Sequence, residues 1–387
     1  MKNTFPPAPD FCRPRGAAVV ACLLAAACVS GVSAPEAPGW RILAPLPDPV
    51  GYGGMFAGVL GGRLVTGGGS QWDRPIWLKG QRRFSDRVFT LAAPDGRWVE
   101  ETVRLPAPCG YFASGTTADA IYLAGGLGPA GCVRAGWLWR AERSRLVSHP
   151  LPDLPHPLGY ACGAVAGGRF WVVGGLRDPN AKEASQEVWS LDVTGAGEGN
   201  WRREADLPGP GVFVATAAAN GPDLYLFGGM AFDAAGKFAP SPRAYHLNTA
   251  DRMWRKLPDL PEPRVGSASP APVLNSRQIF LIGGYGEVSP AAPREHPGFP
   301  PQTLYFDLQA GTWGRGPVLP VSPVPDRDAP GDPGPAPMIG APAAMWQGYA
   351  VVIGGEVRAS VRSPAVVAWP AVRPLAGPPP ASAPASR

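Results

Sequence analysis

The sequence has few charged residues and few histidines. Only 17% of its 387 residues are Asp, Glu, Lys or Arg, and only four are His. The formal net charge is +5, but nowhere do five basic residues follow one another. Nucleic-acid binding needs clustered Lys and Arg, so we expect no nucleic-acid partner. The sequence has no Cys-x-x-Cys pair and no Cys/His cluster, so it predicts neither a metal site nor a cofactor.

The sequence also lacks an apolar run long enough to span a membrane. The stretch 16–28 is shorter than the roughly 20 residues that a spanning helix needs. It follows three basic residues, which is typical of an export signal, so we assign 1–34 to a signal peptide and expect an exported, periplasmic protein. Two processing schemes remain open. Val32-Ser33-Ala34 has the small-residue form of a cleavage site, whereas 24–28 resembles a lipoprotein box that would anchor Cys28 to the membrane.

Cysteine is scarce in the predicted mature chain. Three of the six cysteines lie in the leader, which leaves Cys109, Cys132 and Cys162. An odd number allows one disulfide and one free thiol in an oxidising compartment. Alternatively, all three are small buried apolar residues. The sequence leaves both interpretations open.

Glycine and proline are abundant, and the glycines recur in a fixed context. The chain has 51 Gly and 50 Pro, and six short β-branched or aromatic runs each end in a Gly-Gly pair. The pairs are Gly67-Gly68, Gly125-Gly126, Gly174-Gly175, Gly228-Gly229, Gly283-Gly284 and Gly354-Gly355. Successive pairs lie 49 to 71 residues apart, a spacing typical of kelch repeats. We therefore predict an all-β fold, a six-bladed kelch-type β-propeller over 38–372, followed by a Pro-rich disordered tail over 373–387.

Most repeats carry a Trp before a Leu-Pro turn. These residues are Trp98, Trp201, Trp254 and Trp313, with Leu146 in the second repeat. We predict that the large rings pack between neighbouring blades. The sixth repeat lacks this strand, but 40–47 near the N-terminus has its pattern. We therefore predict that the N-terminal strand completes the last blade and closes the ring, which removes exposed sheet edges.

The loops after the Gly-Gly pairs converge at one mouth of such a ring, and two of them carry functional groups. The last contains Glu356 and Arg362. A carboxylate beside a crowded backbone and a guanidinium can be tuned for acid–base catalysis, although a solvated ion pair accounts for the same residues. The first interleaves Trp72 and Lys79 with other aromatic and basic residues. Trp faces stack on sugars and cations hold anions, although a basic surface loop is the alternative.

Motifs at both ends of the repeat region carry a family resemblance. Gly340-Ala341-Pro342-Ala343 is followed by Gly355-Glu356 and then by Arg362-Ser363-Pro364. This pattern resembles the last blade of the sialic-acid (N-acetylneuraminate) mutarotases or epimerases, in their cyclically permuted kelch branch. The segment 51–59 is similar to the first blade of that family. The resemblance covers about residues 40–371, and its middle repeats are generic.

The resemblance implies an isomerase that interconverts the α and β anomers of N-acetylneuraminate or a related sugar. The substrate would be a small anionic sugar, and no cofactor would be needed. The family's catalytic Glu and Arg correspond to Glu356 and Arg362, and Tyr111 joins Trp72 and Lys79 as a candidate for substrate binding. The sequence departs from the family pattern at 69–72 and at 109–112, which leaves the preferred sugar open.

Two other functions use the same kind of fold. A non-catalytic kelch propeller binds glycans or proteins at the cell surface, because fold alone does not fix function. A copper-radical oxidase needs His and Tyr ligands that converge on the metal. His149 and His156 flank a Pro turn between blades, away from the mouth, so the sequence disfavours the oxidase.

Overall fold

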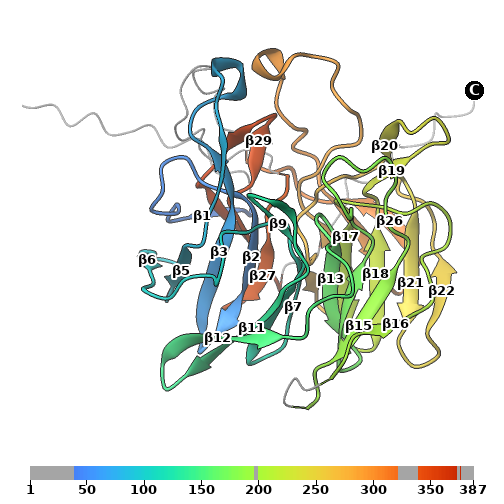
Figure 1. Cartoon of the computed structure of the whole chain (residues 1–387), viewed down its shortest axis with the longest axis horizontal. Helices are drawn as coiled ribbons and strands as arrows, with labels where there is room; N and C mark the ends of the chain where they lie inside the picture. The colour runs from blue at the N-terminus through green and yellow to red at the C-terminus, as the bar shows by residue number, and fades with distance from the viewer. Residues whose placement is uncertain (1–38, 196–198, 321–338, 373–374, 376–387) are drawn as a thin grey trace, which may run out of the picture. The chain divides into compact units, whose positions relative to one another are not determined.

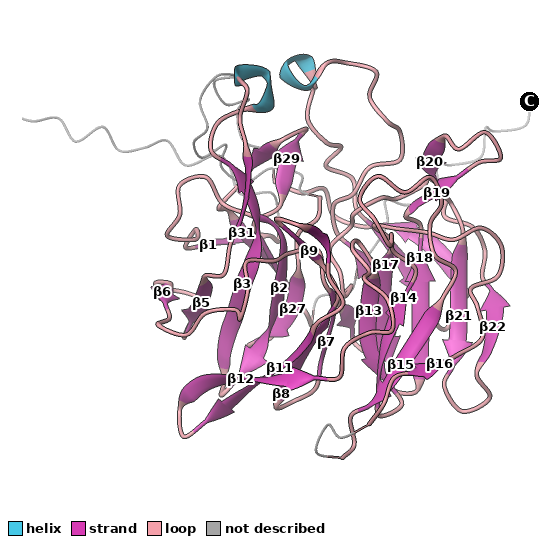
Figure 2. Cartoon of the chain, in the orientation of Figure 1, coloured by secondary structure: helices cyan, strands magenta, loops and turns pink. Residues whose placement is uncertain are grey.

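A computed structural model describes residues 39–195, 199–320, 339–372 and 375. The predicted leader with its three cysteines, and therefore both processing schemes, lie outside these residues. No helix in the described ranges is long and apolar enough to cross a membrane. The regular structure is nearly all β, and Figure 2 shows the two short helical turns in cyan.

Six antiparallel sheets, each with four main strands in a row, form the blades of a ring (Figure 1). The first blade contains β2 (Gly53–Leu60), β3 (Arg63–Trp72), β5 (Val88–Leu91) and β6 (Val99–Glu100). The second blade contains β7 (Ala113–Thr116), β8 (Ala120–Ala124), β11 (Gly136–Glu142) and β12 (Arg145–Leu151). The third blade contains β13 (Cys162–Ala166), β14 (Arg169–Val173), β15 (Val188–Asp192) and β16 (Arg202–Arg203). The fourth blade contains β17 (Thr216–Asn220), β18 (Asp223–Phe227), β21 (Ala244–Asn248) and β22 (Met253–Lys256). The fifth blade contains β23 (Val273–Leu274), β24 (Gln278–Leu281), β25 (Leu304–Asp307) and β26 (Thr312–Arg315). The predicted six-bladed kelch-type propeller is confirmed.

The last blade is shared between the two ends of the chain. It contains β27 (Ala343–Trp346), β28 (Tyr349–Ile353), β31 (Val366–Pro370) and β1 (Arg41–Leu43). The N-terminal strand β1 pairs antiparallel with β31, with Ile42 opposite Val367. The predicted closure of the ring by the N-terminal strand is therefore confirmed.

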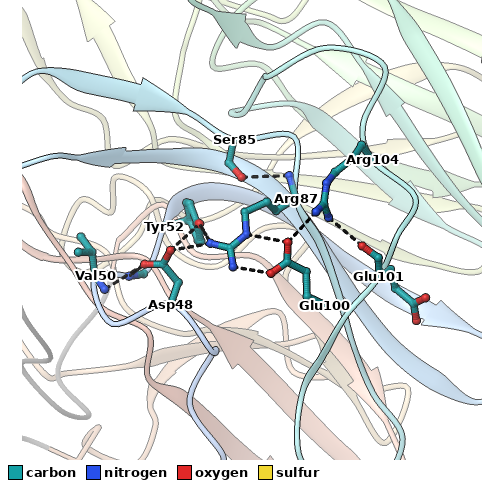
Figure 3. A network of polar contacts seen from close by, with 9 residues as sticks. Asp48, Val50, Tyr52, Ser85, Arg87, Glu100, Glu101 and Arg104 are labelled. Carbon is teal, nitrogen blue, oxygen red and sulfur yellow. Dashed lines mark hydrogen bonds and ion pairs between the residues drawn. The ribbon is translucent and has the colours of Figure 1, made fainter.

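A polar network reinforces this closure (Figure 3). The carboxylate of Asp48, just after β1, accepts hydrogen bonds from the Tyr52 hydroxyl at 2.8 Å and from Arg87 at 2.7 Å. Arg87 also donates to both carboxylate oxygens of Glu100, at 3.0 and 2.6 Å. Burial, helped by the Asp48 carboxylate, raises the pKa of Tyr52. The backbone carbonyl of Tyr52 accepts a hydrogen bond from the Gly355 N–H at 2.8 Å, so the network also supports the loop that begins there.

The repeated Trp residues join successive blades, as predicted. Each indole N–H donates to a backbone carbonyl of the preceding blade. The pairs are Trp98 with Ala44 at 2.8 Å, Trp201 with Pro152 at 2.8 Å, Trp254 with Ala205 at 3.2 Å, and Trp313 with Pro258 at 2.9 Å. Leu146, which replaces the Trp in the second blade, is buried.

Several short elements are added at one end of the ring. Strand β4 (Arg82–Phe84) pairs with β3. Three hairpins are formed by β9 (Leu127–Gly128) with β10 (Gly131–Cys132), β19 (Met230–Phe232) with β20 (Phe238–Pro240), and β29 (Glu356–Arg358) with β30 (Val361–Arg362). The two helical turns are η1 (Ile76–Leu78) and η2 (Pro293–Glu295). In Figure 1, β29, β19, β20 and both helical turns lie toward the top of the view. This end carries the loops that follow the Gly-Gly pairs.

The three cysteines of the propeller are free thiols. Cys109 and Cys162 are buried, and burial raises the pKa of each thiol to about 12. These two therefore fit the interpretation as buried apolar residues. Of the predicted tail, the structure describes Leu375, which is buried and exchanges two backbone hydrogen bonds with the Gln278 side chain. The other residues of the tail lie outside the described ranges.

Candidate functional site

One residue from each blade belongs to a closed ring of backbone hydrogen bonds. The N–H of each donates to the carbonyl of the residue in the preceding blade, over N···O distances of 2.7–3.2 Å. The six residues are Gly54, Tyr111, Tyr160, Val214, Gly266 and Gly340. All six have left-handed backbone conformations, with φ between +52° and +74°. They also line one small cavity of about 60 Å³, so the ring surrounds the centre of the propeller.

The residue before each ring member pairs with a residue just after the Gly-Gly pair of the same blade. These pairs are Gly53–Ser70, Gly110–Leu127, Gly159–Leu176, Phe213–Met230, Val265–Tyr285 and Ile339–Glu356. Glu356 thus occupies a position that is apolar or aromatic in four of the other blades. Its backbone is held by two hydrogen bonds of 2.9 Å with Ile339. The propeller geometry therefore brings Glu356 to the central mouth.

A cavity of about 980 Å³ lies at this mouth and is lined by residues of all six blades. One part of its wall is polar and is formed by Arg82, Tyr111, Tyr160, Glu356 and Arg362. Another part is apolar and aromatic and is formed by Phe213, Met230, Phe232, Phe238 and Val288. The cavity therefore suits a ligand with both a charged group and apolar surface.

Four of the five predicted site residues line this cavity. Glu356, Arg362, Trp72 and Tyr111 all belong to its wall. Lys79 is exposed at the end of η1, has a left-handed backbone, and is not among the lining residues. The structure thus brings together the last loop, the first loop and the second blade, but it does not place Lys79 with them.

Glu356 and Arg362 face each other across the two strands of the β29–β30 hairpin. Their side chains form an ion pair between Oε2 and a terminal guanidinium nitrogen. The other oxygen of Glu356 accepts a hydrogen bond of 2.6 Å from the Ser360 N–H. The Glu356 side chain is 20% exposed, whereas that of Arg362 is 4% exposed, so the carboxylate is the more accessible of the two. Burial lowers the pKa of Arg362.

The Arg362 guanidinium contacts three neighbouring residues. Besides the ion pair, Nε donates to the Ser70 carbonyl at 3.1 Å and the second terminal nitrogen donates to the Tyr111 hydroxyl at 3.1 Å. A Cβ atom on Gly53 would lie 3.0 Å from this Nε, so the glycine leaves room for the guanidinium. The two terminal nitrogens of Arg362 therefore contact Glu356 and Tyr111, one residue each.

Arg82 extends the polar wall beyond Arg362. It donates from Nε to the Ser70 hydroxyl at 2.9 Å and from a terminal nitrogen to the Tyr160 hydroxyl at 3.2 Å. Its guanidinium carbon also lies 4.8 Å from the centre of the Tyr111 ring. Arg82 is half-buried, and it places a second positive charge at the cavity wall.

The two tyrosines of the ring differ in acidity. Their aromatic rings lie 4.8 Å apart. Burial by itself would raise the pKa of Tyr111, but the guanidinium groups of Arg362 and Arg82 outweigh burial and lower the pKa to about 8. For Tyr160, burial is the largest effect and, together with the neighbouring Tyr111, it raises the pKa.

Sequence reasoning missed Tyr160 and did not single out Arg82. Tyr160 follows Gly159 as Tyr111 follows Gly110, so an alignment of the repeats at this point would have found it. Arg82 lies in the first loop beside Arg83, and nothing in the sequence separates the two. In the structure Arg82 faces the cavity, whereas the Arg83 side chain is 65% exposed and pairs with Asp73.

Metal-binding groups are not gathered in the part of the chain that the structure describes. No three His, Cys, Asp or Glu side chains there could hold one metal ion. His149 and His246 each contact a single carboxylate at 2.7 Å, Glu142 and Asp223 respectively. The functional groups at the mouth are instead a carboxylate, two guanidinium groups and two phenols.

Comparison with solved structures supports the propeller fold. A chain described as "Structure of YjhT" matches with a TM-score of 0.60, covering 83% of this chain and 94% of that chain. The two are 14% identical in sequence, so this likeness concerns the fold. No family model matches the sequence. The cyclic permutation of the repeats that the sequence resemblance implies stays a prediction.

Comparison with curated proteins supports the predicted family resemblance. A protein of Pasteurella multocida (strain Pm70) named N-acetylneuraminate epimerase is 28% identical over 229 residues, which are 55% of this chain and 57% of that protein. A protein of Vibrio cholerae with the same name is 30% identical over 145 residues, or 35% of this chain and 34% of that protein. The matches thus span between a third and somewhat over half of these relatives. The predicted resemblance is confirmed: the chain is similar in sequence to proteins named N-acetylneuraminate epimerase.

Proposed function

We propose that this protein is a mutarotase that interconverts the α and β anomers of N-acetylneuraminate or a closely related acidic sugar. The observation that carries the proposal is the Glu356–Arg362 ion pair at the wall of the central cavity, with Glu356 the more accessible partner. Similarity to proteins named N-acetylneuraminate epimerase supports the choice of sugar. The enzyme would be an isomerase and would need no cofactor.

Mutarotation requires opening and reclosing of the sugar ring. A base removes the proton of the anomeric hydroxyl, and the ring oxygen gains a proton as its bond to the anomeric carbon breaks. Glu356 is the proposed base, because its ion pair with Arg362 requires the carboxylate form. On ring closure at the other face, Glu356 returns the proton to the new anomeric hydroxyl.

The carboxylate of the substrate needs a cationic partner at the same wall. The Arg362 side chain is 4% exposed and already contacts Glu356, Ser70 and Tyr111, which favours a role in holding these groups over direct capture of the substrate carboxylate. Arg82 lines the cavity, with Nε on Ser70 and one terminal nitrogen on Tyr160. We assign the substrate carboxylate to Arg82, whose remaining N–H groups can form charge-assisted hydrogen bonds.

The proposed function is tested by anomer exchange measured with proton NMR on purified protein. We expect N-acetylneuraminate to exchange faster than its uncatalysed rate, and neutral hexoses to show no acceleration. Equal acceleration of neutral hexoses would contradict the assignment of an acidic sugar. Absence of acceleration for every sugar would contradict the mutarotase itself.

A non-catalytic glycan-binding propeller is the second candidate. The aromatic wall favours it, because Phe213 and Phe232 stack with their ring centres 5.5 Å apart beside the cavity, and aromatic faces bind sugars. Saturable binding of N-acetylneuraminate without faster anomer exchange would support this candidate over the mutarotase.

The cellular location of the protein is also a proposal. The leader predicted at 1–34 implies export to the periplasm, with Cys28 as the candidate for lipid attachment. Mass spectrometry of the protein purified from its membrane and soluble fractions distinguishes the schemes. A start at residue 35 supports simple cleavage, and a lipidated Cys28 at the N-terminus supports the anchor.

A further inference from the structure

Tyr111 occupies a position in the hydrogen-bonded ring where three of the six blades have glycine. Its φ is +57°, a left-handed conformation that bulky residues rarely adopt and that costs on the order of 1–3 kcal/mol. The surrounding structure holds it there: the Tyr111 N–H donates to Gly54 at 2.7 Å, and its carbonyl accepts from Tyr160 at 3.2 Å. The other five blades share this conformation at the same position, so the ring itself imposes it and holds Tyr111 at the cavity wall.

The Tyr111 hydroxyl lies among groups that leave its proton available. Arg362 donates to the hydroxyl oxygen at 3.1 Å, and a guanidinium can only donate. The Ser70 hydroxyl lies 3.3 Å away and already accepts a hydrogen bond from Arg82. The phenol oxygen therefore serves as an acceptor toward Arg362, while its own proton can be donated to Ser70 or to a ligand in the cavity.

Tyr111 and Glu356 contact the two terminal nitrogens of the same guanidinium. These nitrogens share one carbon atom, as do the anomeric hydroxyl and the ring oxygen of a sugar. Both residues line the cavity, so a carboxylate and a phenol are available there for the two oxygens of one anomeric carbon. Resting on the mutarotase function proposed above, we propose that Tyr111 is the general acid of ring opening, paired with Glu356 as the base.

The proton and electron balance of this step is complete without another reactant. Glu356 takes the proton of the anomeric hydroxyl, and the freed electron pair forms the carbonyl bond. The bond from the anomeric carbon to the ring oxygen breaks, its electron pair stays on that oxygen, and the Tyr111 phenol protonates it. On reclosure the new hydroxyl attacks the other face of the carbonyl and returns its proton to Tyr111, while Glu356 protonates the carbonyl oxygen.

The electrostatic surroundings of Tyr111 suit proton exchange near neutral pH. The two guanidinium groups outweigh burial and place the pKa of Tyr111 at about 8, so the phenol is mostly protonated at neutral pH and its phenolate is stabilised. The pKa of Tyr160 is raised instead, by burial first. Tyr225 serves as the control, because it does not line the cavity and burial raises its pKa to about 12.

The test compares Tyr111→Phe with Tyr225→Phe over a pH series. Anomer exchange of N-acetylneuraminate is measured by proton NMR, with the uncatalysed rate subtracted at each pH. In the wild type, kcat/KM should fall above about pH 8, because the acid must be protonated. Tyr111→Phe should lower kcat by about 100-fold or more and abolish this alkaline fall. Tyr225→Phe should keep both the alkaline fall and kcat.

A titration of tyrosinate absorbance in the ultraviolet supplies a measurement that is independent of catalysis. The wild type and Tyr225→Phe should show one tyrosine that ionises near pH 8, and Tyr111→Phe should lack it. Wild-type activity with an unchanged kcat and pH profile in a folded Tyr111→Phe variant would overturn the role of Tyr111 and leave the mutarotase intact. A wild type that accelerates no exchange would overturn both.

Discussion

Glu356 and Arg362 are register partners in the β29–β30 hairpin, and their side chains form an ion pair at the wall of the central cavity. The hairpin begins directly after the Gly354-Gly355 pair, whose second N–H donates to the Tyr52 carbonyl at 2.8 Å. Tyr52 belongs to the network that reinforces the closing blade. The closure of the ring and the candidate site are thus joined through this backbone contact.

Replacement of Arg82 tests the binding of the substrate carboxylate. Hydrogen bonds to charged groups contribute about 1.5–3 kcal/mol, so Arg82→Met should raise KM for N-acetylneuraminate by about 10- to 100-fold, with a smaller effect on kcat. The control is Arg83→Met, because this neighbour is 65% exposed and pairs with Asp73. Steady-state exchange rates over a range of sugar concentrations give both constants. An unchanged KM for Arg82→Met would argue against this role.

Gly54 offers a test of how the first blade supports Tyr111. Its φ is +74°, and a Cβ atom there would lie 2.7 Å from the Tyr111 ring. Gly54→Ala should therefore lose stability by more than the cost of the left-handed backbone alone, about 1–2 kcal/mol, and should lower the exchange rate. Gly62→Ala is the matched control, because Gly62 has a φ of +76° and a Cβ atom there would meet nothing within 4 Å. Equal stability and activity of the two variants would contradict the account.

Leu43 tests the closure of the ring. It lies in β1 opposite Val366 and is 3% exposed. Leu43→Ala should reduce the free energy of unfolding by about 2–5 kcal/mol, as is usual for a buried leucine. Val99→Ala, at a strand residue that is 58% exposed, should change it by no more than about 0.5 kcal/mol. Denaturant titrations give both values, and a small effect at Leu43 would show that β1 contributes little to closure.

The Arg87–Glu100 pair predicts a pH-dependent stability. Hydrogen bonds from Arg87 hold the pKa of Glu100 below its usual value. The folded pKa is thus lower than the unfolded one, so the stabilisation is present above the unfolded value and is lost as the pH falls through the folded value. The difference in Tm between wild type and Arg87→Met should shrink as the pH is lowered from about 7 to about 3. Arg97→Met, at an exposed arginine of the same blade, should show no such trend, and a constant difference for Arg87→Met would refute the prediction.

Much of the fold could be predicted from the sequence because the repeat is periodic. Gly-Gly pairs mark strand ends, and the missing outer strand of the sixth repeat has its counterpart at 40–47. The structure pairs these two ends of the chain through β1 and β31. The interblade role of the Trp residues followed from their place in each repeat.

The candidate site could be predicted only in part. Glu356 was identified because it follows a Gly-Gly pair and matches a family motif. Lys79 and Arg82 come from one long loop, and sequence does not determine which side of such a loop faces the cavity. The ring of left-handed residues also escaped prediction, because left-handed backbone at Tyr111 and Tyr160 is imposed by hydrogen bonds between blades.

The central claim is that Glu356 acts as the base of anomer exchange. The most direct measurement is the rate of α/β exchange of N-acetylneuraminate by proton NMR with wild type, Glu356→Gln and Glu287→Gln. Glu287 is an exposed glutamate in the corresponding loop of the preceding blade and does not line the cavity. We expect Glu356→Gln to lose about 10²–10⁴-fold in catalysed rate while it stays folded by circular dichroism, and Glu287→Gln to match wild type. A folded Glu356→Gln variant that exchanges the anomers at the wild-type rate would contradict the account.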